Sequence, residues 1–231
     1  MKKFFAISIA ALLAVSCNFI NDPDKPDNYD PLYSICAYQN GGNISKTVYI
    51  ESSDMKVVQE EYVYENNDWV FDCKAVTERT FDSKGNVTDM KQTVYDQAGA
   101  VTGTSQVRYT NEYNGTRLSD TYTEILDEDG EWVKNRHLTM VYMMDSNLVS
   151  DIVYSYYNEE TEEYEPSQMR SFSYYNNMVV SYETSLYDKE SDKWTVIAEC
   201  EYIYDDYMRL MKLAENDKVK PAESTITTYY Y

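Results

Sequence analysis

The chain has 231 residues, with 40 Asp or Glu against 20 Lys or Arg, and its formal net charge at pH 7 is −20. This excess of carboxylates argues against nucleic acid as a partner, because affinity for nucleic acid comes largely from Lys and Arg that neutralise phosphates. The same excess disfavours anionic lipid headgroups as a binding surface.

Residues 1–16 have the organisation of an export signal. Two lysines precede an apolar run over residues 4–15, which is shorter than the roughly 20 residues that a transmembrane helix needs. The run has the length of a signal-peptide core, and it ends in small residues directly before Cys17. We therefore expect cleavage after residue 16 and acylation of Cys17, which would join the mature chain to the membrane. The alternative is an ordinary secretory signal with a chance cysteine.

Residues 17–43 are predicted to hold the lipidated cysteine and an acidic tether. Asp and Pro dominate residues 22–31. Proline lacks a backbone donor, so a stretch of this kind suits neither a helix nor an inner strand. We expect a solvated, semi-extended linker between the anchor and the folded domain.

Residues 44–231 predict a single domain built from an internal repeat. The units of 30 or 31 residues are 60–90, 91–120, 121–151, 152–182 and 183–212. Each unit holds two β-prone runs and two polar turns, in which pairs such as Asn-Gly, Asp-Gly or Asn-Asn tolerate the positive φ of tight hairpins. With flanking strands at 45–51 and 225–231, the prediction is an all-β, antiparallel up-and-down meander of about twelve strands. An open twisted sheet rarely keeps that many, so we expect the sheet to curl or roll partly into a barrel.

Alternation along the strands predicts one face that is more apolar than the other. In the last unit the more apolar set is Trp194, Val196, Ala198, Cys200, Tyr202 and Tyr204. The opposite set is mixed, which indicates a sheet buried on one side. Lys134 and Arg136 fall on the apolar set of the third unit, and a lipid-facing charge costs about 2–4 kcal/mol at the midplane of a bilayer. We therefore do not expect a transmembrane barrel.

Three cysteines remain besides Cys17, namely Cys36, Cys73 and Cys200. An odd number permits at most one disulfide and leaves a free thiol. Cys73 and Cys200 fall on the same face of the first and last units, but a bond between them would require the sheet to close end to end. We favour two buried thiols.

A large residue follows the first turn of four of the five units. These residues are Trp69, Trp132, Tyr164 and Trp194, and Val101 takes the place in the second unit. The favoured interpretation is structural, because cross-strand aromatic pairs stabilise sheets by about 0.2–1 kcal/mol each. The functional interpretation is an aromatic platform that binds a glycan or an extended partner chain, since Tyr and Trp are enriched at interfaces.

The sequence offers little for catalysis, metal binding or cofactors. His137 is the sole histidine, and a surface position in a strand accounts for it. Asp127-Glu128-Asp129-Gly130 resembles the start of a calcium loop, but Trp132 and Lys134 stand where further ligands would be needed, so a hairpin turn is favoured. Weak calcium binding by the acidic turns stays open. We predict no catalytic residue, no metal site and no cofactor.

The cysteine box at 13–17, the acidic tether and the five repeats together resemble the tyrosine-rich β-repeat surface lipoproteins of Bacteroidetes. Val94 to Gly99 and Arg79 to Gly85 are also loosely similar to tyrosine–aspartate repeats of secreted bacterial proteins. The resemblance implies an outer-membrane lipoprotein, exposed on the cell surface or facing the periplasm, and it implies no activity. We expect a non-catalytic binding module for a glycan or protein partner. The alternative is a structural or assembly component of the membrane surface that pairs through its sheet edges and takes no small ligand.

Overall fold

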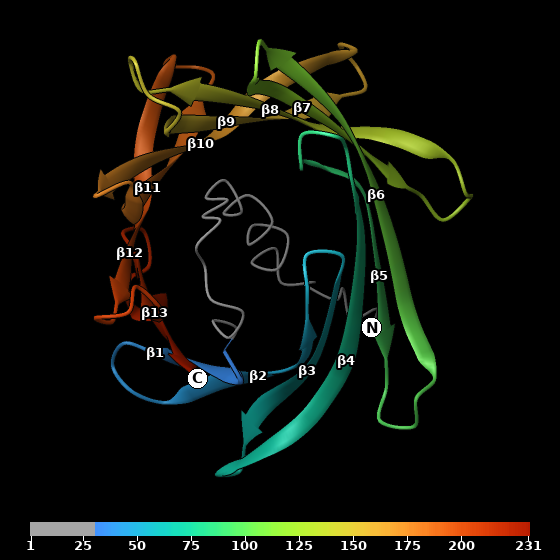
Figure 1. Cartoon of the computed structure of the whole chain (residues 1–231), viewed down its shortest axis with the longest axis vertical. Coiled ribbons are helices and arrows are strands. Elements are labelled where there is room, and N and C mark those ends of the chain that lie inside the picture. The colour runs from blue at the N-terminus through green and yellow to red at the C-terminus, as the bar shows by residue number, and fades with distance from the viewer. Residues whose placement is uncertain (1–30) are drawn as a thin grey trace.

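The computed structural model describes residues 31–231, so the expected signal peptide, Cys17 and most of the tether lie outside the described residues. Fourteen antiparallel strands close into a single barrel (Figure 1). The strands are β1 (Tyr33–Tyr38), β2 (Asn43–Ser52), β3 (Lys56–Glu65), β4 (Asp68–Phe81), β5 (Val87–Tyr95), β6 (Val101–Asn114), β7 (Arg117–Leu126), β8 (Trp132–Tyr142), β9 (Val149–Asn158), β10 (Glu163–Tyr175), β11 (Met178–Asp188), β12 (Lys193–Tyr204), β13 (Leu210–Asp217) and β14 (Thr225–Tyr230). A short 3₁₀ helix, η2 (Pro221–Glu223), precedes β14. The described part of the chain contains no helix with the length and apolar character of a membrane span.

The predicted all-β antiparallel meander is confirmed. The predicted number of about twelve strands and the partly rolled sheet were wrong, because fourteen strands form a closed barrel. Each strand pairs with its neighbours in the sequence, and β1 then pairs with β14, with Tyr33 opposite Tyr230. The ten strands from β3 to β12 are the five predicted two-strand units. The additional strands are β13 and β1, and β1 lies inside the range 17–43 that was assigned to the tether. Closure pairs every strand on both sides, which removes the exposed edges of an open sheet.

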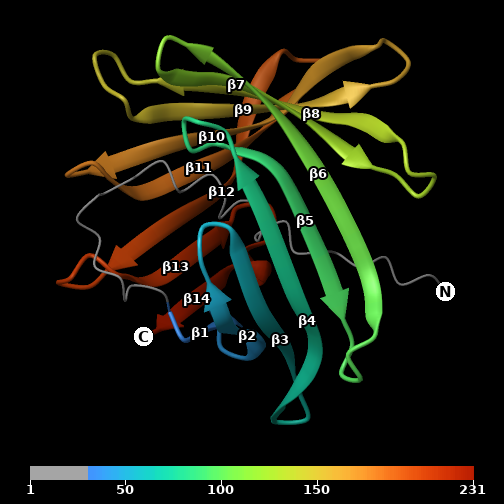
Figure 2. The ribbon, with the colours of Figure 1, turned by 45° about the vertical axis from the view of Figure 1, so that its right-hand side comes forward.

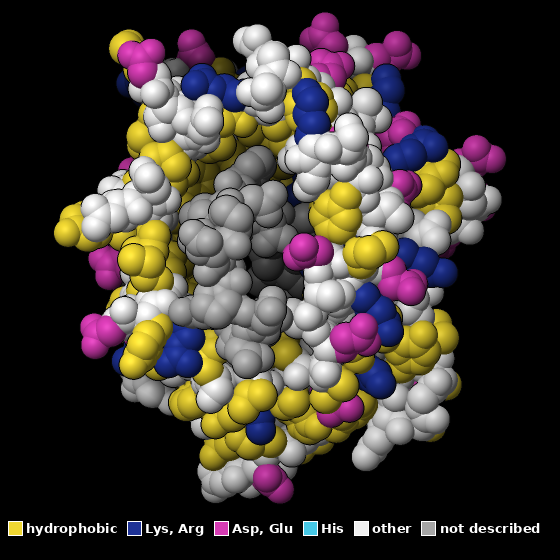
Figure 3. Space-filling view, in the orientation of Figure 1, with side chains coloured by type: hydrophobic (Ala, Val, Ile, Leu, Met, Phe, Trp, Pro, Cys, Tyr) yellow, Lys and Arg dark blue, Asp and Glu magenta, His cyan; other side chains and the backbone are white. Residues whose placement is uncertain are grey.

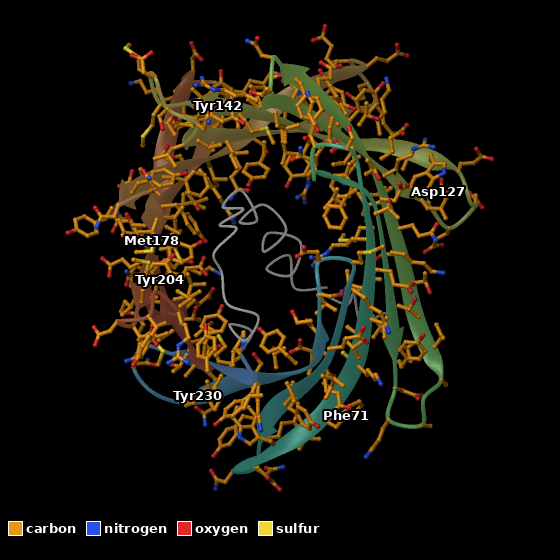
Figure 4. The ribbon with its side chains drawn as sticks, in the orientation of Figure 1. Phe71, Asp127, Tyr142, Met178, Tyr204 and Tyr230 are labelled. Carbon is orange, nitrogen blue, oxygen red and sulfur yellow. The ribbon has the colours of Figure 1, made fainter. Side chains whose placement is uncertain are left out.

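The hairpin turns alternate between two rims of the barrel (Figure 2). One rim holds the turns 39–42, 66–67, 96–100, 127–131, 159–162 and 189–192 and the connection 218–224, and we call it the acidic rim. These segments carry Asp96, Asp127, Glu128, Asp129, Glu131, Glu159, Glu160, Glu162, Glu190, Asp192 and Glu223, against Lys189, Lys218 and Lys220. Figure 4 places Asp127 on the right and Phe71 at the bottom, and both lie near this rim.

The opposite rim holds the turns 53–55, 82–86, 115–116, 143–148, 176–177 and 205–209, together with the start of β1 and the end of β14. We call it the tether rim, because the chain from the predicted tether enters the barrel here. Its turns carry Asp54, Asp82, Asp145, Asp205 and Asp206, against Lys84 and Arg209. Figure 4 places Tyr142, Met178, Tyr204 and Tyr230, which lie near this rim, on the left.

A one-residue bulge follows each turn from the β3–β4 hairpin to the β12–β13 hairpin. The unpaired residues, all in the second strand, are Asp72, Thr88, Thr102, Ser119, Asn135, Ser150, Ser167, Val180, Ile197 and Met211. Each bulge shifts the alternation by one position, so Trp194 and Val196 lie on one face and Cys200 on the other. The prediction that Trp194 to Tyr204 form one apolar face was therefore wrong. Bulges also increase the local twist, which favours closure.

One face of the sheet forms the interior of the barrel. The buried residues Thr121, Thr123, Met140, Ile152, Tyr154, Thr184 and Cys200 share this face. It also holds Arg136 and Arg170, whose guanidinium groups lie 4.8 Å from the ring centres of Tyr156 and Tyr182. The other face carries charged cross-strand pairs such as Arg108–Glu124 at 2.7 Å, and Figure 3 shows basic and acidic side chains mixed on the right of the barrel. We therefore assign it to the outside.

Four turns share one hydrogen-bonded structure. They begin at Asp82, Asp96, Asp127 and Asp205, and each of these aspartates accepts the backbone N–H groups of the second and fourth residues after it at 2.8–3.0 Å. The residue three places after Asp has positive φ. It is glycine in the first three turns, with φ of 81–82°, and Met208 in the fourth, with φ of 63°. A residue with a Cβ atom pays about 1–2 kcal/mol for that conformation.

Within residues 31–231, Cys36, Cys73 and Cys200 form no disulfide bond. The sheet closes through β1 and β14, so that β13, β14, β1, β2 and β3 separate Cys200 on β12 from Cys73 on β4. Closure therefore does not bring these two cysteines together. Cys200 is 0% exposed, and Cys73 is half-buried.

Candidate functional site on the outer wall

The predicted site residues all lie on the outer wall beside the acidic rim. Trp69, Trp132, Tyr164 and Trp194 stand at or near the start of β4, β8, β10 and β12. Each faces the residue that precedes its own turn, in the pairs Tyr64–Trp69, Leu126–Trp132, Tyr157–Tyr164 and Tyr187–Trp194. In the three fully aromatic pairs the ring centres lie 4.9–5.2 Å apart. These are the cross-strand pairs that the structural interpretation predicts.

The four residues do not form one flat platform. Neighbouring strands lie about 4.8 Å apart, so residues on β8, β10 and β12 are separated by roughly 10 Å along the sheet. Trp69 on β4 is four strands further from Trp132 on β8. Tyr164 instead contacts His137 on β8 and Tyr122 on β7, with 5.6 and 5.7 Å between ring centres.

A groove on the same wall offers a concave surface. It has a volume of about 620 Å³ and is lined by Glu60, Tyr62, Phe71, Lys74, Val76, Tyr95, Asp96, Gln97 and Gly99. These residues come from β3, β4, β5 and the β5–β6 turn, at the acidic rim. Ligand pockets typically measure about 300–1,000 Å³ and combine aromatic walls with a few polar groups. The groove has this composition and size.

The bulge at Asp72 makes the groove. Strict alternation would place Phe71 and Lys74 on opposite faces, but the unpaired residue between them puts both on the outside. Phe71 then meets the edge of Tyr62 across the β3–β4 pair, with 5.7 Å between ring centres. Lys74 lies opposite Tyr95 on β5. Three aromatic rings and one ammonium group therefore line the same surface.

Polar groups lie beside the aromatic rings of the groove. The Tyr62 hydroxyl donates to Glu60 at 2.8 Å, and this hydrogen bond raises the pKa of Tyr62 above its usual value. Lys74 takes part in none of the ion pairs found within residues 31–231. The groove thus presents a carboxylate, an ammonium group and the amide of Gln97 beside aromatic faces.

A second groove of about 540 Å³ lies in the β9–β10 hairpin at the same rim. It is lined by Tyr156, Tyr157, Asn158, Glu159, Glu160, Glu165, Pro166 and Ser167. Lys189 forms an ion pair with Glu165 at 2.9 Å. This groove has two tyrosines but is dominated by carboxylates, so it suits a neutral ligand less well than the first groove.

His137 belongs to an aromatic cluster on the outer wall. Its ring stacks on Tyr122, with 4.3 Å between centres and 3° between planes, and meets the edge of Tyr164. Its Nε2 lies 2.8 Å from Asp120, whose pKa falls although burial alone would raise it, because hydrogen bonds, the largest from His137, favour the carboxylate. Ser155 is its cross-strand neighbour, but among the described residues no hydrogen bond joins the two. The Thr139 hydroxyl lies 3.4 Å from the same Nε2 and donates to Asp120 at 3.2 Å, so polar contacts and two tyrosine rings together hold the imidazole in place.

The acidic turns do not gather into a metal site. The Asp127 carboxylate accepts the N–H groups of Asp129 and Glu131 at 3.0 and 2.8 Å, as a turn requires. Within residues 31–231 no group of three or more His, Cys, Asp or Glu side chains has the arrangement of a metal site.

No family model and no curated protein matches this chain. Several solved structures are distantly similar to this chain, and three of them are described here. A DUF3836 family protein from Parabacteroides distasonis is 10% identical over 52% of this chain and 96% of its own, with a TM-score of 0.37. A protein with unknown function from Bacteroides fragilis is 11% identical over 55% and 91%, with a TM-score of 0.40. A porin-like protein from Bacteroides uniformis is 9% identical over 85% and 95%, with a TM-score of 0.43. No function follows from likenesses of this size.

Proposed function

We propose that the protein is a lipid-anchored, non-catalytic binding module of the cell envelope, and that its ligand is a glycan held in the groove at the acidic rim. The groove itself carries the proposal, because Tyr62, Phe71 and Tyr95 offer rings for the apolar faces of sugars. Glu60 and Lys74 offer acceptors and donors for hydroxyl groups. The site proposed from sequence, Trp69, Trp132, Tyr164 and Trp194, then serves mainly to pair the hairpins.

The proposed location is the outer membrane, with the barrel outside the bilayer. An acylated Cys17 would anchor the chain, and the roughly 15 residues before Leu32 would span up to about 45 Å if extended. Charged pairs on the outer wall, such as Arg108–Glu124, would be costly against lipid tails. Exposure on the cell surface agrees with the acidic tether, and the periplasmic face is the alternative.

The test is a titration of the mature chain with a panel of neutral and acidic polysaccharides, followed by tryptophan fluorescence. Trp69 reports on the groove, because it is the next outward residue before Phe71 on β4. A saturable shift that Phe71→Ala abolishes and Trp194→Ala preserves supports the groove. The Trp194 variant is the matched control, since it removes a ring at the same rim on the far strand β12. If Phe71→Ala and Trp194→Ala change the fluorescence shift equally, the groove is not the ligand-binding site.

The alternative function is a structural or assembly component of the outer membrane surface. The sheet is closed, so such a component has no free edge strand to pair and would have to use its outer wall. A flat response across the polysaccharide panel together with a stoichiometric protein partner on purification would favour this alternative.

A further inference from the structure

The tether rim is the end of the barrel that a lipid anchor would bring to the membrane. The N–H of Leu32 donates to the carbonyl of Tyr230 at 2.7 Å, so the first and last described strands begin and end side by side at this rim. Cys17, the expected lipid site, precedes Leu32 by a short stretch of chain. The acidic rim and its groove lie at the opposite end of the strands.

Large apolar side chains project from the tips of this rim. They are Leu32, Met55, Met144, Tyr175, Tyr207 and Met208, and the most exposed of them, Met144, is 91% exposed. They come from three different turns, from the end of β10 and from the residue before β1. At the acidic rim Tyr38 is 42% exposed at the end of β1, and the exposed Val101 and Val219 are smaller and lie among carboxylates and lysines. Exposed apolar residues that gather at one end of a molecule mark a contact surface.

Met208 gives independent evidence that these side chains have a role. It occupies the left-handed position that glycine fills in the three other turns of the same structure, at φ of 63°. The side chain gains little burial there, since it is 64% exposed. Backbone strain that the fold does not need points to a function for the residue that bears it.

We propose that the tether rim rests on a phospholipid bilayer, with the Met and Tyr side chains at its tips entering the headgroup region. The inference relies on the envelope location proposed above, and it adds a second membrane contact to the acyl anchor. Stable attachment generally takes two such signals. Asp54, Asp145 and Asp206 lie beside the apolar tips, so the surface favours zwitterionic over anionic headgroups.

The test is flotation of the mature chain, residues 17–231 with Cys17→Ser, on vesicles of phosphatidylcholine. This chain keeps every strand of the barrel and lacks the acyl chains. We expect it to float with the vesicles and to float less when phosphatidylglycerol is added. Met144→Asp should lower the partition about tenfold, because it loses most of the burial of one methionine side chain. Val219→Asp, the same kind of change at the acidic rim, should leave the partition unchanged.

Met208→Gly separates membrane contact from folding. It should raise the midpoint of thermal unfolding and at the same time weaken vesicle binding, and no misfolded variant would change both in these directions. Vesicle binding that neither Met144→Asp nor Met208→Gly alters would overturn the proposal. So would self-association in the absence of vesicles that Met144→Asp abolishes, since the rim would then be an interface between copies of this chain. The glycan titration uses no vesicles, so a failure of the groove and a failure of the rim are seen separately.

Discussion

Met208 occupies the position in the β12–β13 turn that Gly130 occupies in the β7–β8 turn. Both turns begin with an aspartate that accepts two backbone N–H groups, and both hold this residue at positive φ. Gly130→Met should therefore reduce the free energy of unfolding by about 1–2 kcal/mol. Urea unfolding measures the change. An unchanged free energy of unfolding for Gly130→Met would contradict backbone strain at this position. The matched control is Ala98→Met, which places the same side chain in the neighbouring turn, one residue before its glycine.

Glu61 should make the barrel less stable at neutral pH than at acid pH. It lies on the inner face, where burial raises its pKa above the ordinary 4.5, despite hydrogen bonds from Thr47 at 2.7 Å and Gln59 at 2.6 Å. A carboxyl group whose pKa is raised by folding costs the folded state little free energy while it is protonated. As the pH rises above 4.5, the unfolded chain ionises first, and stability is lost until the pH passes the folded pKa.

The substitution Glu61→Gln isolates this effect. It should raise the melting temperature at pH 7 and leave it nearly unchanged at about pH 4, because Gln keeps the shape and the Thr47 hydroxyl accepts as well as donates. Glu201→Gln, which removes an exposed carboxylate on the outer face, is the control for the loss of one negative charge. Equal melting temperatures for wild type and Glu61→Gln at pH 7 would show that the buried Glu61 carboxylate does not destabilise the folded protein.

The cysteines of the barrel wall should be slow to react in the folded protein. Burial raises the pKa of the Cys73 thiol to about 11, and Cys200 is fully buried. The thiolate is the reactive form of a cysteine. In a chain with Cys17→Ser and Cys36→Ser, we therefore expect no reaction with a chromogenic disulfide reagent at pH 8 until denaturant is added. Two thiols should then react. Fast reaction before unfolding would mean that the wall opens locally.

The barrel should require β1, in contrast to the domain start at residue 44 expected from sequence. A fragment that begins at residue 44 lacks the strand that joins β14 to β2, and two edges of the sheet become exposed. We expect it to aggregate or to melt at a lower temperature than a fragment that begins at residue 31. Static light scattering and circular dichroism of the two fragments compare them directly. A monomeric, equally stable shorter fragment would show that closure contributes little.

The repeat and its turns could be predicted from sequence, because the turn residues carry local information. Asn66-Asn67 and Asn176-Asn177 were expected to adopt positive φ, and all four do. Closure could not be predicted in the same way. Tyr33–Tyr38 is a short run beside a segment rich in Asp and Pro, and its pairing with β14 depends on contacts that no local pattern reveals.

The bulges explain why the candidate site was only partly foreseen. The bulged positions have no single residue type in common, as Asp72, Asn135 and Ile197 illustrate, so the sequence predicts strict alternation. That assumption places Phe71 and Lys74 on opposite faces and hides the groove. The four aromatic residues were correctly expected beside a single edge, since they follow the turns, but the strands between them keep them apart.

The pairing of Tyr33 with Tyr230 also governs when the protein can fold. A chain that is synthesised from its amino terminus delivers β1 first and β14 last, and the barrel cannot close until both are present. Until then two strands expose unpaired backbone groups, and the long separation in sequence makes their meeting slow. A barrel of this design therefore depends on protection from aggregation until its last strand is made, and a stop codon only a few residues early would leave an unclosed sheet prone to join its neighbours.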